Sequence, residues 1–378
     1  MTGSAAMDLV TWMKAEALPL WVERGWDKTY GGFVEELAPD GNPSDVPFKR
    51  VRVQGRQLFS FSTAALRGWH PQAASLADQG FDYLKAHGRN KDGVWARRLN
   101  RDGSLLDPEM DLYDTAFIVL GLTAYHRLTQ KPEVLALLES TLLMVRANLS
   151  AVAGGYHQSK SDRKFMRQNP HMHWFESMIL AFEATGDRRY LVEAQALYGL
   201  ARDRVIDGKT GALRELFDLR WKPVRERFRI LVEPGHHYEW AWLLARAGKH
   251  MTVDPSLGPK ICGFADRYGV DPATGMVFDQ VSAGGKVTQR THRLWVQTEA
   301  LKAWMVRSDV GEEARTRRIG QLEAGVLRSY FDREPRGSWG DRLEAGGRLL
   351  PGPSPASSFY HILMCVAELA DWRSSKAS

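Results

Sequence analysis

The chain has 378 residues, a formal net charge of +6 at pH 7 and 44% hydrophobic residues, with 13 Trp among them. The charge is small for this length and its basic residues are scattered, so we expect neither nucleic acid nor a membrane as a partner. No segment has the length of a membrane span, and the first apolar run carries Asp8, Lys14 and Glu16, unlike a signal peptide. We therefore expect a cytoplasmic protein, a monomer or homodimer, with a large apolar core.

Six glycine-centred turns recur along the chain at intervals of about sixty residues. They are Gly31-Gly32-Phe33, Gly93-Val94-Trp95, Gly154-Gly155-Tyr156, Gly211-Ala212-Leu213, Gly275-Met276-Val277 and Gly337-Ser338-Trp339. Stretches between the turns, such as Asp114 to Leu128 and Trp174 to Thr185, have apolar residues at helical spacing. Each repeat thus predicts two helices and one hairpin. With no polar capping repeat at either end, the pattern predicts an all-α (α/α)6 toroid with short β-hairpins at one end, and residues 1–378 as a single domain.

A second periodic set follows the turns by about twenty to twenty-five residues. Its members are Arg56, Tyr113, His173, His236, Trp295 and His361. Residues at the same position in each repeat should lie at the same level along the axis of the ring, each on its own inner helix. We therefore expect these side chains to converge at one end of the central cavity.

Histidines are concentrated in the segments 167–176 and 233–240. Glu239 follows His236 by three positions and shares its helix face, so we expect this carboxylate to orient the imidazole. His171 and His237 are interpreted as structural, pointing between helices, and Asn169 as the N-cap before Pro170.

Metal and cofactor motifs are absent from the sequence. The neighbouring histidines in these two segments diverge on a helix, and no pair has the four-residue spacing of helical zinc ligands. A metal site assembled across helices stays open, but we expect no metal. Glycine-rich phosphate-binding motifs are absent as well, so we expect no nucleotide cofactor.

Six segments resemble the N-acylglucosamine 2-epimerase superfamily, in the right order and over nearly the whole chain. They are Gln54-Gly55-Arg56, Leu112-Tyr113-Asp114, 169–176, 234–242, 295–300 and Phe359-Tyr360-His361. The resemblance implies an (α/α)6 barrel that interconverts sugars at C1 and C2 without metal or nucleotide. It also implies that His236 and His361 are the catalytic residues, since they match the two catalytic histidines of the family. The family's substrate-contacting residues match Arg56, Tyr113, Asn169, His173, Glu239 and Trp295.

The Asn-Pro-His-Met-His run at 169–173 resembles the aldose–ketose isomerases of that superfamily. We therefore predict an isomerase that converts D-mannose to D-fructose through a cis-enediol. His236 would move the proton between C2 and C1, His361 would assist ring opening, Arg56 would stabilise the enediolate, and Trp295 would stack on the sugar.

Four alternatives stay open. One is a mannose/glucose 2-epimerase. Another is a mannose-6-phosphate isomerase. We expect Arg52, one helical turn from Arg56, to face the same cavity and contact the substrate, and its added guanidinium would favour a phosphorylated sugar. The third is an (α/α)6 glycoside hydrolase that uses Glu176, Glu239 and Glu299, and the fourth is a non-catalytic sugar-binding protein.

Overall fold

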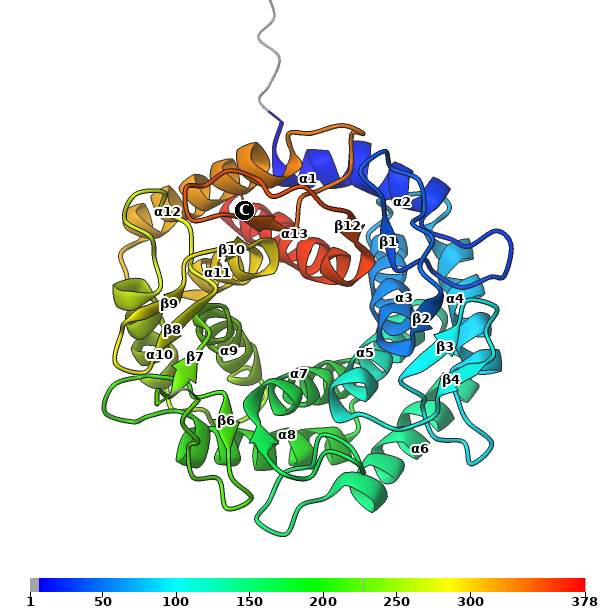
Figure 1. The fold of residues 1–378 in the computed structure, drawn as a ribbon, viewed down its shortest axis with the longest axis horizontal. Helices are drawn as coiled ribbons and strands as arrows, with labels where there is room; N and C mark the ends of the chain where they lie inside the picture. The colour runs from blue at the N-terminus through cyan, green and yellow to red at the C-terminus, as the bar shows by residue number, and fades with distance from the viewer. Residues whose placement is uncertain (1–6, 227, 378) are drawn as a thin grey trace, which may run out of the picture.

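The computed structural model describes residues 7–226 and 228–377. Within them, helices alternate between an inner and an outer ring (Figure 1). The inner ring comprises α3 (Val51–Leu66), α5 (Leu112–Thr129), α7 (Gln168–Thr185), α9 (Pro234–Ala247), α11 (Leu294–Val306) and α13 (Ala356–Ala377). The outer ring comprises α1 (Leu9–Trp12), the π-helical turn η1 (Met13–Ala17), α2 (Leu18–Arg24), α4 (Ala73–His87), α6 (Pro132–Leu149), α8 (Arg188–Leu200), η2 (Ala201–Val205), α10 (Leu257–Tyr268), α12 (Glu312–Val326) and η3 (Leu327–Phe331). The predicted (α/α)6 toroid is confirmed.

Burial separates the two rings. The inner helix α5 is buried along nearly its whole length, because it packs against other helices on several sides. The outer helix α4 buries one face, with Leu76, Gly80 and Leu84 at helical spacing. Glycines bring α3 and α5 close together, since a Cβ on Gly55 would lie 2.5 Å from the Phe117 carbonyl oxygen. Among the residues that the structure describes, no helix combines the length and apolarity needed to cross a membrane.

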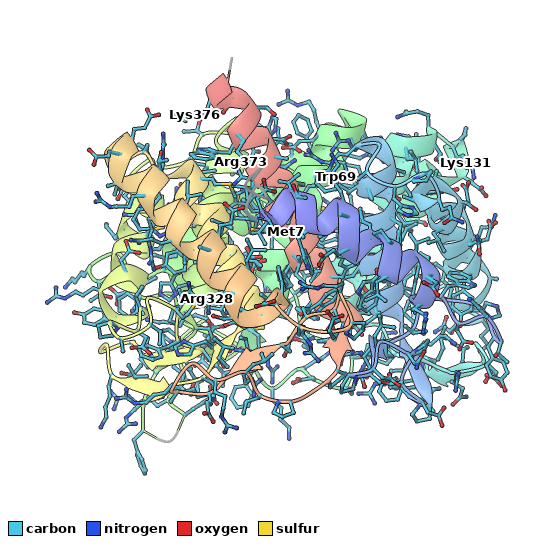
Figure 2. The ribbon with its side chains drawn as sticks, turned by 90° about the horizontal axis from the view of Figure 1, so that it is seen from above. Met7, Trp69, Lys131, Arg328, Arg373 and Lys376 are labelled. Atoms are coloured by element: carbon cyan, nitrogen blue, oxygen red, sulfur yellow. The ribbon has the colours of Figure 1, made fainter. Side chains whose placement is uncertain are left out.

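Short antiparallel strands gather at one end of the ring (Figure 2). The pairings are β1 (Glu36–Leu37) with β12 (Ser354–Pro355), β2 (Phe48–Arg50) with β3 (Arg98–Asn100) and β3 with β4 (Leu105–Asp107), β5 (Met166–Arg167) with β6 (Leu216–Phe217), β7 (Leu231–Val232) with β8 (Gln280–Ser282) and β8 with β9 (Val287–Gln289), and β10 (His292–Arg293) with β11 (Arg342–Leu343). Strands β2, β5, β10 and β12 lead directly into inner helices. The strand end of the ring is therefore the end at which inner helices begin.

The glycine turns are held by side chains of the inner helices. The leading glycine of every turn has a positive φ, the backbone region that glycine adopts without strain. After the third turn, the backbone N–H of Tyr156 donates to Nε2 of His171 at 2.8 Å, and after the fourth, that of Leu213 donates to Nε2 of His237 at 2.9 Å. Burial lowers the pKa of both imidazoles to about 4, so they stay neutral. Their predicted structural role is confirmed.

The two ends of the chain close the ring. Strand β1 pairs with β12, with Glu36 opposite Pro355. The ring of Trp12 in α1 stacks on Phe331 of η3, with 3.9 Å between their centroids. This closure brings the start of α13 beside α3, and it places residues from both ends of the chain around one cavity.

Candidate active site

A cavity of about 370 Å³ opens at the strand end of the ring. The six side chains predicted from repeat phase all line it: Arg56, Tyr113, His173, His236, Trp295 and His361. The remaining lining residues are Arg50, Asn169, Glu233, Glu239, Arg293, Asp341, Arg342, Pro355, Ser357 and Ser358. The six-fold set lies in the first two turns of successive inner helices, so the expected convergence is confirmed. Helix N-termini carry partial positive charge, which favours an anion that develops between them.

Each histidine of the cavity is paired through Nδ1 with a carboxylate. His173 lies 3.0 Å from Glu176 Oε2, His236 lies 2.9 Å from Glu215 Oε1, and His361 lies 2.8 Å from Glu299 Oε1. An ionised carboxylate only accepts hydrogen bonds, so each carboxylate favours the proton on Nδ1 and leaves Nε2 free to exchange a proton with a ligand. At His236, the amide nitrogen of Gln168 competes for Nδ1 at 2.9 Å.

The surroundings separate the two predicted catalytic histidines. At His236, burial acts to lower the pKa, but the charge and hydrogen bond of Glu215, together with the charge of Glu233, outweigh it and leave the pKa raised. At His361, burial lowers the pKa well below its usual value, and the cations of Arg56 and Lys302 act in the same direction. Of the two, His236 is therefore the stronger base.

The partner predicted for His236 is wrong. Glu215, which lies just before β6, makes the contact, while Glu239 has both carboxylate oxygens buried without a hydrogen bond and lies 3.6 Å from Nδ1 of His173. Sharing a helix face with His236 brings Glu239 into the cavity but not to the imidazole. Burial, reinforced by repulsion from Glu299, raises the pKa of Glu239 well above its usual value.

Glu215 belongs to a periodic set that spacing could have revealed. An acidic residue follows the leading glycine by four positions in four of the repeats: Glu35, Glu215, Asp279 and Asp341. Three of them accept the backbone N–H of the residue that precedes an inner helix: Arg50 at 2.6 Å, Glu233 at 3.3 Å and Arg293 at 2.7 Å. These acids therefore anchor the helix starts, and in the fourth repeat the same carboxylate also binds an imidazole.

Arg56 is held rigidly beside the histidines. Its guanidinium donates to the Tyr113 hydroxyl at 2.8 Å and to the Ser357 carbonyl at 2.9 Å, and lies 3.7 Å from the Phe117 ring centroid. Trp295 lies between the two predicted catalytic imidazoles, with its ring centroid 5.2 Å from His236 and 5.7 Å from His361. This arrangement offers a flat apolar surface, a cation and two proton-exchanging nitrogens to one small ligand.

Two local expectations are wrong. Arg52 does not line the cavity, because its Nη1 pairs at 2.7 Å with Asp114 on the neighbouring helix α5. Asn169 is not an N-cap, since α7 already begins at Gln168 with Arg167 as its cap. Asn169 does line the cavity as expected, and its Oδ1 is buried without a hydrogen-bond partner. That oxygen is thus available to accept a hydrogen bond from a bound ligand.

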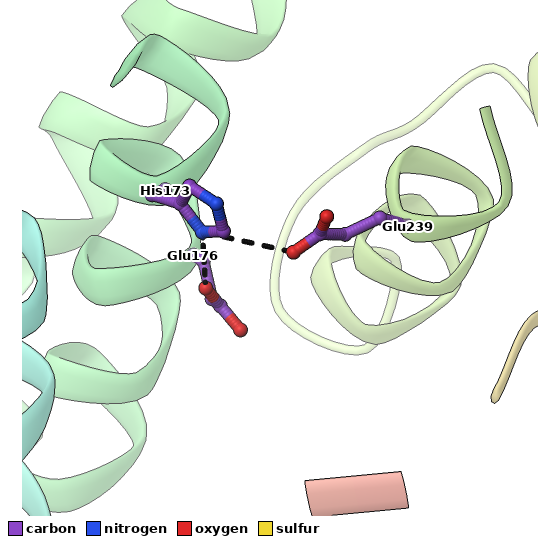
Figure 3. A group of neighbouring side chains, drawn as sticks. All are labelled: His173, Glu176 and Glu239. Atoms are coloured by element: carbon purple, nitrogen blue, oxygen red, sulfur yellow. Dashed lines mark hydrogen bonds and ion pairs between the residues drawn. The ribbon is translucent and has the colours of Figure 1, made fainter. Parts of the chain in front are cut away.

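The acidic residues in and behind the cavity have some features of a metal site. His173, Glu176 and Glu239 (Figure 3), and likewise Glu239, Glu299 and His361, place potential ligand atoms within 4.8 Å of one another. However, the Nδ1 atoms of both histidines already serve hydrogen bonds to carboxylates, and Lys302 supplies a cation 2.7 Å from Glu299 Oε2. The donor set is thus partly occupied by contacts within the chain.

Residues 31–365 match the family model of N-acylglucosamine 2-epimerase. A curated protein of Rhizobium meliloti named mannose-6-phosphate isomerase is 34% identical over 377 residues, covering 97% of each chain. A cellobiose 2-epimerase of Bacteroides fragilis is 26% identical over 318 residues, covering 75% of this chain and 77% of the relative. The crystal structure of a D-mannose isomerase superposes with a TM-score of 0.87 at 20% identity, covering 98% of this chain and 100% of that one.

Proposed function

Because the chain belongs to the N-acylglucosamine 2-epimerase family, and is thus a sugar isomerase or epimerase, we propose that it interconverts D-mannose and D-fructose through a cis-enediol. The observation that carries the proposal is the pair of carboxylate-bound imidazoles, His236 and His361, on either side of Trp295. Two proton-exchanging nitrogens around one stacking surface are what an aldose–ketose isomerisation by proton transfer requires.

Ring opening comes first, since the C2 hydrogen becomes acidic only beside a C1 carbonyl. In the proposed mechanism, Nε2 of His361 takes the proton of the anomeric hydroxyl and returns it to the ring oxygen as the C1–O5 bond breaks. The low pKa of His361 keeps its imidazole neutral and able to accept that proton.

Proton transfer between the carbons follows. His236 takes the C2 proton, electrons move into the C1–C2 bond, and negative charge develops on O1. Arg56 and the N-termini of the inner helices stabilise that charge. O1 then gains a proton as O2 loses one, and His236 returns its proton to C1, which yields the ketose. Glu215 stabilises the imidazolium during this cycle.

A phosphorylated hexose is the second candidate, and one cavity residue favours it. Arg342 is about half exposed, and its nearest carboxylate contact, with Asp279, spans 3.9 Å. Two other arginines that line the cavity have closer carboxylate partners: Arg50 lies 2.5 Å from Glu35, and Arg293 lies 2.8 Å from Glu233. Arg342 is thus the guanidinium most available to a 6-phosphate, the substrate group named for the Rhizobium meliloti relative.

The glycoside hydrolase alternative receives little support. An inverting hydrolase needs two carboxyl groups that face the substrate about 6.5–9.5 Å apart. Of the three glutamates considered for that role, only Glu239 lines the cavity. Glu176 is bound by His173 and Tyr360, and Glu299 by Lys302 and His361.

Product analysis tests the proposal. The protein is incubated separately with D-mannose, D-glucose, D-fructose, cellobiose and mannose 6-phosphate, and the products are identified by NMR. We expect mannose and fructose to interconvert. Conversion of mannose to glucose without fructose would identify a 2-epimerase instead. Turnover of mannose 6-phosphate alone, with a KM that rises strongly in Arg342→Ala, would establish the second candidate.

A further inference from the structure

A lysine is buried behind the cavity, where the proposed reaction does not use it. Lys302 lies on α11 with 0% of its side chain exposed, and it does not line the cavity. Its Nζ pairs with Glu299 Oε2 at 2.7 Å and lies 4.0 Å from the Trp242 ring centroid. The other oxygen of Glu299 lies 2.8 Å from Nδ1 of His361. The carboxylate of Glu299 thus contacts both Lys302 and His361.

Three carboxyl groups share this enclosed region, and one buried ammonium faces them. Burial raises the pKa of Glu299, and the charge of Lys302 acts against that rise. Burial also acts to lower the pKa of Lys302, but Glu299, Glu239 and Glu176 outweigh it and keep the pKa raised. A buried carboxyl group without a cation normally takes up a proton, because an isolated charge is costly away from water. Without Lys302, Glu299 would therefore become neutral.

The state of Glu299 determines which nitrogen of His361 carries the proton. An ionised Glu299 accepts Nδ1–H and leaves a lone pair on Nε2. A protonated Glu299 that carries its proton on Oε1, the oxygen facing the imidazole, would instead donate to Nδ1. The imidazole proton would then lie on Nε2, which could no longer accept one. Arg56, His173 and Glu176 act on the imidazole directly through their charges, and so does the charge of Lys302, in addition to its effect through Glu299.

We propose that Lys302 is a positioning residue of the reaction: by keeping Glu299 ionised, it selects the tautomer of His361 that can take a proton at Nε2. This inference rests on the proposed function, since it assigns Lys302 a part in that reaction. The role differs from general stabilisation, because it predicts a change at one imidazole rather than loss of the fold.

The first test compares Lys302→Met with a matched control, Lys49→Met. Lys49 is also buried in an ion pair, 2.9 Å from Asp27, but lies outside the cavity lining. We expect Lys302→Met to lower kcat by a factor of about 10² or more, the scale on which a wrong histidine tautomer acts, with KM changed less than about three-fold. Lys49→Met should lower Tm while leaving kcat within about three-fold. Equal kcat values in the two variants would overturn the proposal.

The second test is rescue. In Glu299→Gln/Lys302→Met, the Gln oxygen can accept Nδ1–H and no buried carboxylate needs the ammonium. We expect this variant to recover about ten-fold or more in kcat over Lys302→Met, which would be a non-additive effect. It also keeps the test available if Lys302→Met does not fold. The proposal would be contradicted if kcat of the double variant were no higher than the combined losses of Glu299→Gln and Lys302→Met predict.

The third test reads the tautomer without turnover. In protein with ¹⁵N-labelled histidine, the His361 signals are identified by their loss in His361→Gln. We expect a protonated Nδ1 in the wild type and a protonated Nε2 in Lys302→Met. An unchanged tautomer would refute the inference. If the wild type converts no sugar, the proposed function fails, and this measurement still decides whether Lys302 acts on His361.

Discussion

Replacing Glu215 by Gln tests which histidine serves as the base. His236 must be neutral to take the C2 proton, and its pKa is raised chiefly because Glu215 outweighs the effect of burial. The wild-type kcat/KM should therefore fall on the acid side, with an apparent pKa above the ordinary value of about 6.5. Removing the charge of Glu215 lowers the pKa of His236, so the acid limb of the profile should move to lower pH.

The expected shift follows from the geometry of the pair. The contact is 2.9 Å between Nδ1 and Oε1. The two charges are spread over the imidazolium and the carboxylate, so their centres lie farther apart than these two atoms. Two unit charges about 4 Å apart interact by about 4 kcal/mol at an effective dielectric constant of 20, which corresponds to about three pKa units at 1.36 kcal/mol each. The amide oxygen introduced by Glu215→Gln can still accept the hydrogen bond from Nδ1, so this figure is an upper bound, and Glu233 continues to raise the pKa. We expect the acid limb to move by about one to three pH units.

The assay is kcat/KM for mannose across pH 4.5 to 9, with Glu183→Gln as the matched control. Glu183 contacts His250 at 2.9 Å in another glutamate–histidine pair, outside the cavity lining. Its replacement should leave the acid limb in place. An acid limb that Glu215→Gln does not move, or a wild-type profile flat to well below pH 6, would refute the reasoning. The low pKa of His361 would then make that residue the base.

Three further results are expected. Extensive chelation should leave the rate nearly unchanged, because imidazoles and Arg56 supply the proposed chemistry; a loss restored specifically by manganese or zinc would show that the mechanism is incomplete. Conversion of mannose in D2O should place deuterium at C1 of fructose, and His236→Ala and His361→Ala should each lower kcat by about 10² or more; unlabelled fructose together with an active double variant would point to hydride transfer. His171→Ala leaves the Tyr156 N–H buried without its acceptor, so it should cost about 1–3 kcal/mol of unfolding free energy and leave kcat nearly intact, whereas a selective loss of kcat would give His171 a part in the reaction.

The repeat could be deduced from the sequence because its causes are local. A tight turn with positive φ needs glycine, and helices between two layers need apolar residues at helical spacing, so both recur in every copy. Equal phase then placed Arg56, Tyr113, His173, His236, Trp295 and His361 around one cavity without any knowledge of side-chain contacts. The structural role of His171 and His237 followed in the same way, since neighbours on a helix point in different directions.

The pairing of side chains was decided by the tertiary structure alone. Glu239 lies on the same helix as His236, but the imidazole is bound by Glu215, which arrives from the hairpin before β6. Arg52 has the helical phase of a cavity residue, but Asp114 of α5 draws its guanidinium away. The pair formed by Lys302 and Glu299 on α11 reaches His361 on the next inner helix, α13, and only the packing of these two helices brings the three side chains together. Helical phase sets the direction in which a side chain leaves its helix, but the lowest-energy partner of a buried charge depends on which opposite charges the other helices place within reach.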